Sequence, residues 1–500
     1  MSYVFTKQFS TPVFNGKISV NTGLFIDGQY VHAIDRKTIK VIDPTNESAI
    51  TEVACAMEED VDAAVKAADR AYRETWGLQV PGYERGRLLN RLADLLEQNI
   101  DEVSAIEAID CGKMFLHVKT MDIANVLSII RYFAGWADKV SGKTIETEES
   151  KFAYTRYEPV GVCGLITPWN FPIMVTASKI APALAAGNTV VIKPSEVTPL
   201  SALKLGEFTA EAGFPPGVFN VIPGYGTVAG QALSENPLVR KISLTGSTST
   251  GRIIMETASK TNLKRTTLEL GGKSPNLIFD DADLEQAVRW SSLGIFHHSG
   301  QMCSAGSRIY VQEGIYDKFL AAFTVASQAG QPGSVFDAAT SQGPVVSLVQ
   351  YERVMGYIKA GTTAGARIHV GGTRIGTTGY YIQPTIFVDA TADMSIVREE
   401  IFGPVAVIIR FKNEADAIEM ANDSMYGLAS NIFTADVSRA LRVANALDAG
   451  CVNINMASIA DSRVPFGGIK GSGFGKELGE YALGAYTNVK AVQINIGTNL

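Results

Sequence analysis

The sequence predicts an α/β protein in which short apolar strands alternate with helices to form a doubly wound parallel sheet. Three observations lead to this prediction: strands that are apolar throughout, helical segments between them, and a second cycle of the same pattern after Pro275. Strands that are apolar throughout are typical of parallel sheets, because helices cover both faces. The 500 residues are enough for two to four domains with large cores.

The N-terminal third is predicted to be helical between residues 58 and 141. An Ala-rich segment spans 60–72, and apolar residues recur every 3.6 positions through 85–99 and again through 121–140. These patterns indicate three helices.

Strands and helices alternate from residue 160 onward. The predicted strands are 160–167, 189–193, 218–223 and 241–245, and the predicted helices between and after them are 173–186, 201–212 and 251–259. After Pro275, further strands are predicted at 276–279, 308–311 and 405–411. This second cycle indicates a second α/β domain.

Two segments fit neither domain. Residues 151–158 and 485–496 alternate in side-chain character, as exposed antiparallel strands do. Strands with unpaired edges invite pairing with another subunit, so both segments are predicted to take part in assembly. An ordinary edge hairpin within the chain is an equally weighted alternative.

Composition excludes several classes of protein. The net charge is −7 and the basic residues are scattered, which argues against a nucleic-acid surface. Five widely spaced cysteines and the absence of zinc-ligand spacing indicate no metal site and a reducing compartment. The apolar runs are interrupted by Pro, Gly and Asn, so no membrane span is expected. We expect a cytoplasmic protein, with the mitochondrion less favoured.

Cys303 is the leading candidate for a reactive residue. It is flanked by small, turn-prone residues, and Glu269 lies 34 positions upstream, ahead of Gly271 and Gly272. A thiolate nucleophile with a carboxylate base is a recurring arrangement for covalent catalysis on a carbonyl. Taken singly, Cys303 could be a small buried apolar residue and Glu269 a surface charge at a strand end.

Seven motifs occur in one order along the chain. They are TPWNFP (167–172), KPSE (193–196), GSTSTG (246–251), ELGG (269–272), Cys303 with its small neighbours, EEIFGP (399–404) and PFGG (465–468). Together they resemble the NAD(P)-dependent aldehyde dehydrogenase superfamily over essentially the whole chain, most closely its tetrameric cytosolic and mitochondrial members. The resemblance implies a Rossmann-like NAD-binding domain (1–140 and 160–268), a catalytic α/β domain (269–480) and oligomerisation strands (141–159 and 485–500).

The resemblance also implies the catalytic residues. Cys303 would add to the aldehyde, and Asn170 with the Cys303 N–H would stabilise the oxyanion. Glu269, with its pKa raised in an apolar pocket, would activate water to hydrolyse the thioester. Glu477 and Lys179 would relay a proton. A turn role for Asn170 and a helix-start ion pair for Glu477 are the alternatives.

NAD is the implied cofactor. The glycine-rich turn from Gly246 to Gly251 follows a strand and opens a helix, a context suited to a pyrophosphate. Lys193 and Glu196 would bind the adenosine ribose, and the Glu196 carboxylate would repel a 2′-phosphate, favouring NAD over NADP. The other implied cofactor residues are Trp169, Ser195, Ser247, Leu270, Gln350, Arg353, Glu400 and Phe402. Arg353 replaces the lysine often present in the family.

The predicted substrate pocket departs from that of better-known relatives. Its residues are Phe171, Met174, Ser178, His297, Met302, Ala460 and Phe466. Ser178 replaces a frequent tryptophan, His297 an aromatic ring and Ala460 a bulky residue, so the pocket should be wider and more polar. A bulky, aromatic or functionalised aldehyde is therefore predicted, with a broad-specificity aliphatic enzyme as the alternative.

Two other classes of protein fit the sequence less well. A non-catalytic NAD-binding relative would have no use for Cys303, Glu269 and Asn170 together. A CoA-acylating relative typically lacks the base glutamate. The predicted partners are a small-molecule aldehyde and further copies of the chain, in a tetramer or a dimer.

Overall fold

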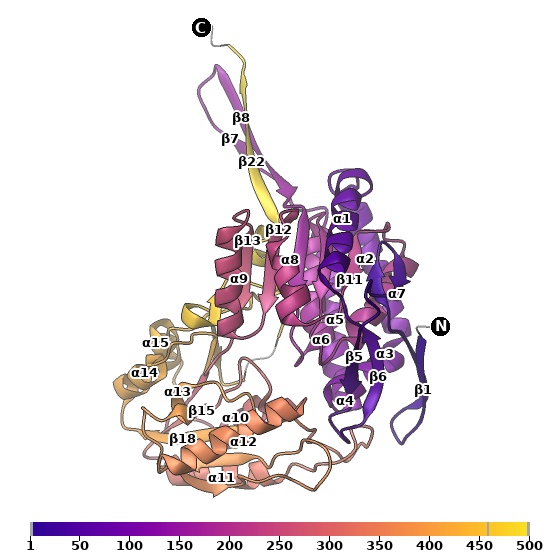
Figure 1. Ribbon diagram of the computed structural model, residues 1–500. Coiled ribbons are helices and arrows are strands. Elements are labelled where there is room, and N and C mark those ends of the chain that lie inside the picture. The colour runs from indigo at the N-terminus through magenta and orange to yellow at the C-terminus, as the bar shows by residue number, and fades with distance from the viewer. Residues whose placement is uncertain (1–3, 458–459, 498–500) are drawn as a thin grey trace.

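A twisted eight-stranded sheet forms the centre of the first of two α/β bodies in the computed structural model, which describes residues 4–457 and 460–497 (Figure 1). Across the sheet the strands are β21 (Gly473–Phe474), β13 (Arg265–Glu269), β12 (Val239–Thr245), β9 (Val162–Ile166), β10 (Thr189–Lys193), β11 (Phe219–Val221), β3 (Leu24–Ile26) and β4 (Gln29–Val31). The strands from β13 to β11 run parallel, whereas β21, β3 and β4 pair antiparallel at the edges. The predicted doubly wound parallel sheet is confirmed.

Helices cover both faces of this sheet. They are α1 (Glu58–Glu74), α2 (Gly82–Gln98), α3 (Ile100–Cys111), α4 (Phe115–His117), the π-helix η1 (Val118–Asp122), α5 (Ile123–Trp136), α6 (Pro172–Ala185), α7 (Leu200–Ala212), the π-helix η2 (Gly226–Gly230), α8 (Gln231–Glu235) and α9 (Thr248–Lys260). Two short antiparallel pairs complete the body: β1 (Val4–Ser10) with β2 (Asn15–Asn21), and β5 (Thr38–Ile42) with β6 (Ala49–Ala54). In the described part of the chain no helix is both long and apolar enough to cross a membrane.

The second body contains a seven-stranded sheet. Its strands in order are β16 (Arg367–Val370), β17 (Thr385–Val388), β18 (Val405–Phe411), β15 (Arg308–Gln312), β14 (Pro275–Ile278), β19 (Ala429–Phe433) and β20 (Cys451–Ile454), and only β16 pairs antiparallel. Its helices are α10 (Leu284–Phe296), α11 (Tyr316–Gln328), α12 (Leu348–Thr363), α13 (Ser395–Arg398), α14 (Glu414–Asn422) and α15 (Val437–Ala446). The second predicted α/β unit is confirmed.

The chain returns to the first body after residue 472. The short helices η4 (Lys470–Ser472) and α16 (Tyr481–Gly484) flank this return, and β21 joins the first sheet beside β13, with Gly473 opposite Glu269. The predicted domain boundaries remain a proposal. At one place the sheets divide the chain differently: β21 pairs in the first sheet, although it falls inside the segment 269–480 that is predicted to form the catalytic domain. Residues 1–3, 458–459 and 498–500 of the predicted ranges lie outside the described residues.

The predicted assembly strands form an arm that projects from the first body (Figure 1). β22 (Thr487–Asn495) pairs antiparallel with β8 (Lys151–Pro159) over nine residues, and β7 (Thr144–Ile145) completes the sheet. The two segments therefore pair with each other within one chain. The outer edge of β22 has no neighbouring strand among the described residues.

Candidate active site

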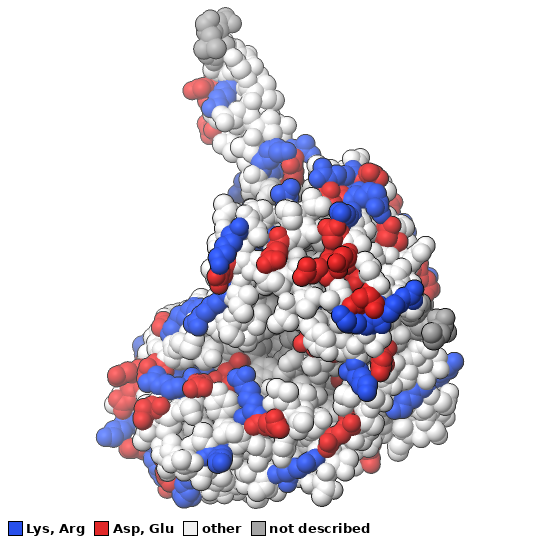
Figure 2. All heavy atoms as spheres, in the orientation of Figure 1, with Lys and Arg blue, Asp and Glu red and all other residues white. Residues whose placement is uncertain are grey.

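A cavity of about 300 Å³ lies between the two bodies, where the surface is visibly hollowed (Figure 2). The predicted site residues that line it are Trp169, Asn170, Phe171, Met174, Ser178, Gly246, Ser247, Glu269, Leu270, His297, Met302, Cys303, Gln350, Arg353, Glu400, Phe402, Ala460, Phe466 and Glu477. Five predicted residues do not line it: Lys179, Lys193, Ser195, Glu196 and Gly251. The fold thus gathers segments that are far apart in the sequence.

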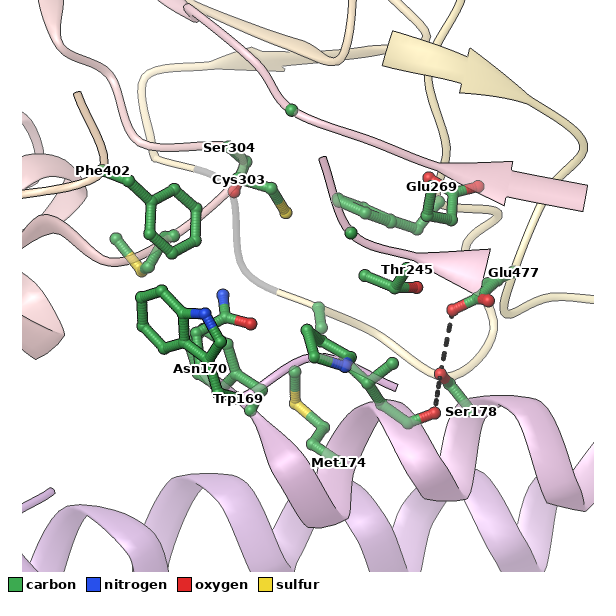
Figure 3. A pocket seen from close by; sticks show the side chains of 18 of the residues that line it. Trp169, Asn170, Met174, Ser178, Thr245, Glu269, Cys303, Ser304, Phe402 and Glu477 are labelled. Carbon is green, nitrogen blue, oxygen red and sulfur yellow. Dashed lines mark hydrogen bonds between the residues drawn. The ribbon is translucent and has the colours of Figure 1, made fainter. Parts of the chain in front are cut away.

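Cys303 lies in the loop between the 3₁₀ helix η3 (His297–Gly300) and β15, and its sulfur points into the cavity (Figure 3). The loop lies against the glycine pair after β13, and a Cβ on Gly272 would be only 2.3 Å from the Cys303 carbonyl oxygen. The side chain is partly exposed, which excludes the alternative of a fully buried apolar cysteine. Burial, and then the Glu400 and Glu269 carboxylates, raise the pKa of the thiol to about 12.

Asn170 approaches the Cys303 loop from the first body. It stands just before α6 and is 5% exposed, and its side-chain amide donates to the Gln301 carbonyl at 2.9 Å. In Figure 3 this amide lies on the Cys303 side of the cavity. A fixed amide beside a nucleophile can donate to an oxygen that gains negative charge during the reaction.

Glu269 ends β13 and faces the cavity opposite Cys303 (Figure 3). It is 4% exposed, and within the described residues neither carboxylate oxygen has a hydrogen-bond partner. The alternative of a surface charge is therefore wrong. Burial, and then the charge of Glu477, raise the pKa of Glu269 well above its usual value. The turn at Gly467 leaves room for it, because a Cβ there would lie 2.4 Å from Glu269 Oε1.

Glu477 forms a buried ion pair with Lys179, which is fully buried on α6. The Ser178 hydroxyl donates to the second carboxylate oxygen of Glu477 at 3.0 Å, and Lys179 also donates to Ser243 at 3.0 Å. Glu477 lies in an extended segment bridged to Phe466, so the alternative of a helix-start ion pair is wrong. Ser178, predicted to widen the substrate pocket, also holds Glu477 in place.

Polar and aromatic groups meet at the end of the cavity that lies away from Glu477 (Figure 3). The Glu400 carboxylate accepts the Gly272 N–H at 2.9 Å, and burial raises its pKa to about 7. Arg353 donates to the Glu400 carbonyl at 2.9 Å. The Phe402 and Trp169 rings meet edge to face with centroids 5.1 Å apart. Separately, Gln350 donates to the Phe402 carbonyl at 2.7 Å. A hydrogen-bond-accepting carboxylate beside a guanidinium and two aromatic rings is suited to bind a sugar and a flat ring.

The glycine-rich turn at 246–251, predicted to bind the pyrophosphate, differs from the prediction in where the following helix begins. α9 begins at Thr248 rather than near Gly251, because the Ser247 hydroxyl caps it by accepting the Thr250 N–H at 3.1 Å. Gly246 and Ser247 thus stand at the N-terminus of the helix and line the cavity, whereas Gly251 is buried in the first turn.

Lys193 and Glu196 lie at the end of β10 and form an ion pair with Nζ and Oε2 3.0 Å apart. The Lys193 ammonium also donates to the Gly224 carbonyl at 2.9 Å. The Glu196 side chain is 35% exposed and the Lys193 side chain 4%. Glu196 can therefore be reached from solvent outside the cavity, whereas Lys193 is buried beside it.

The predicted substrate residues line the cavity, but sequence reasoning missed the wall contributed by η1 and α5. Asp122, Asn125 and Ile129 line the cavity there. No motif marks these residues, since they face the cavity only because α5 packs beside α6. The His297 ring, 5.4 Å from that of His117, is neutral near pH 7 because burial lowers its pKa to about 4.

Comparisons with known proteins agree with this arrangement. Residues 30–492 match the family described as the aldehyde dehydrogenase family. An aldehyde dehydrogenase of Agaricus bisporus is 54% identical over 99% of both chains. The structure of the NAD⁺ complex of a Bacillus cereus aldehyde dehydrogenase is similar with a TM-score of 0.94 and 44% identity, covering 95% of this chain and 97% of the other. The structure of betaine aldehyde dehydrogenase from Staphylococcus aureus, also in complex with NAD⁺, is similar with a TM-score of 0.94 and 39% sequence identity, covering 96% of each chain.

Proposed function

This chain belongs to the aldehyde dehydrogenase family and is an oxidoreductase acting on aldehydes, and from this premise we propose that it forms a carboxylic acid through a thioester on Cys303. The observation that carries the proposal is the meeting of Cys303, Asn170 and Glu269 around one cavity, from segments of both bodies. A nucleophile, an oxyanion donor and a buried base are the groups that acyl chemistry at a carbonyl requires.

NAD is the cofactor that the site fits. The α9 N-terminus with Gly246 and Ser247 suits a pyrophosphate, and Glu400 with Trp169 and Phe402 suits the nicotinamide ribose and ring. When bound, NAD supplies the acceptor for the hydride that leaves the substrate carbon. Relatives in the same family have been solved with NAD⁺.

The first half of the reaction is proposed to depend on Cys303 and Asn170. The Cys303 sulfur adds to the aldehyde carbon as its proton departs, giving a thiohemiacetal. The Asn170 amide and the Cys303 N–H donate to the oxygen that becomes negative. Burial, and then the Glu400 and Glu269 carboxylates, raise the pKa of the thiol to about 12, so the thiol has to lose its proton as the carbon–sulfur bond forms.

The second half is proposed to depend on Glu269. Oxidation leaves a thioester, and the ionised carboxylate takes a proton from water as the water attacks the thioester carbon. The carboxylic acid departs and leaves the Cys303 sulfur as a thiolate, which regains its proton from solvent. Glu477 is near enough to raise the pKa of Glu269, so we propose that the pair of Glu477 and Lys179 carries the proton onward.

We propose that the substrate is bulky, aromatic or functionalised. The small side chains of Ser178 and Ala460 leave space, and Asn125 and His297 add polar groups to the wall. We expect kcat/KM for benzaldehyde and hydroxybenzaldehydes to exceed that for acetaldehyde, as measured by NADH formation. Equal values would favour a broad-specificity aliphatic enzyme, and no NADH with any aldehyde would indicate a non-catalytic relative.

Glu196→Gln is expected to raise the use of NADP relative to NAD. The change removes the charge that repels a 2′-phosphate and frees Lys193 to bind it. Because the Glu196 side chain is 35% exposed, solvent screens the effect, and we expect a change of about tenfold in the ratio of kcat/KM values. Glu207→Gln, on α7, is the control. An unchanged ratio would place cofactor choice elsewhere.

We propose that the arm of β8 and β22 joins subunits into a tetramer or dimer. The outer edge of β22 presents unpaired backbone groups, and Val489 and Ile494 are 60% and 43% exposed. Removal of the residues after Thr487 is expected to release monomers or to cause aggregation, as measured by light scattering. An intact chain that is monomeric and fully active would contradict the proposal.

The predicted cytoplasmic location stays a prediction.

A further inference from the structure

Two buried carboxyl groups on α3 accept hydrogen bonds from backbone N–H groups in the first turns of α6 and α7. Glu107 Oε1 accepts the Ile173 N–H at 3.2 Å, and Asp110 Oδ2 accepts the Leu200 N–H at 2.8 Å. Both side chains are completely buried, and neither lines the cavity. Because they are three positions apart on one helix, they share a face and reach two neighbouring helices.

Neither α6 nor α7 caps its own N-terminus with a side chain. The residues at the cap positions are Phe171 and Pro199, and neither side chain can accept a backbone hydrogen bond. The first N–H groups of a helix have no partner within it, and leaving one buried without a partner is costly. Burial raises the pKa of Glu107 to about 7 and that of Asp110 well above its usual value, yet a carboxyl oxygen accepts in either protonation state.

Each capped helix begins where a loop of the proposed site ends. α6 follows the loop that carries Trp169 and Asn170, and α7 follows the loop that carries Lys193 and Glu196. The position of each loop is therefore tied to α3 through one hydrogen bond at its C-terminal end.

A second contact ties the first of these loops to the same region. The Lys113 ammonium, just after α3, lies 3.5 Å from the centroid of the Phe171 ring and is held by Asp122 at 2.6 Å. Phe171 directly follows Asn170. The Asn170 loop is thus held from α3 at two consecutive points, Phe171 and the start of α6.

We propose that α3 is a brace with two separate effects. Glu107 positions the Asn170 loop for the chemical step, and Asp110 positions the loop at 193–196 for binding of the adenosine end of NAD. Both are positioning residues rather than catalytic ones. This inference rests on the proposed function, because it assigns each effect to the role proposed for the loop.

The test compares Glu107→Met and Asp110→Leu in the full-length protein, each change removing the acceptor and keeping bulk. Glu107→Met is expected to slow the pre-steady-state formation of NADH by on the order of ten- to hundredfold, as displacement of a catalytic group does, with the NAD dissociation constant unchanged. Asp110→Leu is expected to weaken NAD binding by about tenfold, the effect of losing one cap, with the rate at saturating NAD unchanged. Glu107→Gln and Asp110→Asn keep an acceptor oxygen and should recover most of each loss.

Equal changes of both quantities in both variants would overturn the proposal, as would a fall in thermal stability alone. Should an apolar variant fail to fold by circular dichroism, Glu107→Asp and Asp110→Glu replace it, because they keep the carboxyl group and displace it by one methylene. If these two replacement variants do not separate the rate of NADH formation from the affinity for NAD in the same way, the proposal is also overturned. If the unaltered protein forms no NADH with any aldehyde, the proposed function fails instead.

Discussion

Replacement of Cys303 by alanine is expected to abolish aldehyde oxidation while NAD binding persists. The variant loses the sulfur that forms the thiohemiacetal, and the alanine methyl group leaves the residues that would contact NAD in place. Loss of a covalent nucleophile lowers turnover by on the order of 10⁴-fold or more. Steady-state NADH formation measures the loss, and fluorescence titration measures NAD binding.

Cys451→Ala is the matched control for this variant. Cys451 is the other cysteine that is partly exposed, but it does not line the cavity. We expect the control to retain activity. Appreciable turnover by Cys303→Ala would rule out the assignment of the nucleophile.

Glu269→Gln is expected to preserve the first oxidation and to slow hydrolysis of the thioester. Rapid mixing should show a burst of NADH near one per active site, followed by turnover reduced by on the order of 10²–10⁴-fold, the range that a general base contributes. The amide is nearly isosteric with the carboxylate, so the cavity should keep its shape.

The pH dependence provides a second test of Glu269. Its pKa is raised by burial, and a base works only when it is ionised, so the rate in the unaltered enzyme should rise with pH through that pKa. This rise should vanish in Glu269→Gln and persist in Glu480→Gln, which removes an exposed carboxylate three positions after Glu477. Disappearance of the burst would mean that Glu269 acts earlier, in deprotonating Cys303.

Local sequence patterns identified several central strands of both sheets but missed others, such as β17 and β19. The predicted strands at 189–193 and 405–411 coincide with β10 and β18, because short apolar runs without alternation are buried on both faces. Boundaries were less accurate where capping decides them. α9 begins at Thr248 because the Ser247 hydroxyl caps it, and the predicted helix at 121–140 begins as a π-turn in η1 and ends at Trp136.

Pairings between distant segments could not be predicted from local pattern. β8 and β22 are more than 300 positions apart in the sequence. The alternation of apolar and polar side chains along each of them indicates an exposed strand but does not identify the strand with which it pairs. The caps supplied by Glu107 and Asp110 likewise have no local signal, since the N–H groups that they accept lie 66 and 90 positions later in the chain. The roles proposed for Cys303 and Glu269 follow from motif order, and the structure adds the cavity that both line and the burial of Glu269.

Mass spectrometry of the Glu269→Gln variant, quenched with acid during the NADH burst, tests the central claim most directly. The account predicts that the protein gains one acyl group in place of a hydrogen, and that the modified peptide contains Cys303. Formation of NADH without an acylated protein, or with the acyl group on another residue such as Cys451, would contradict it.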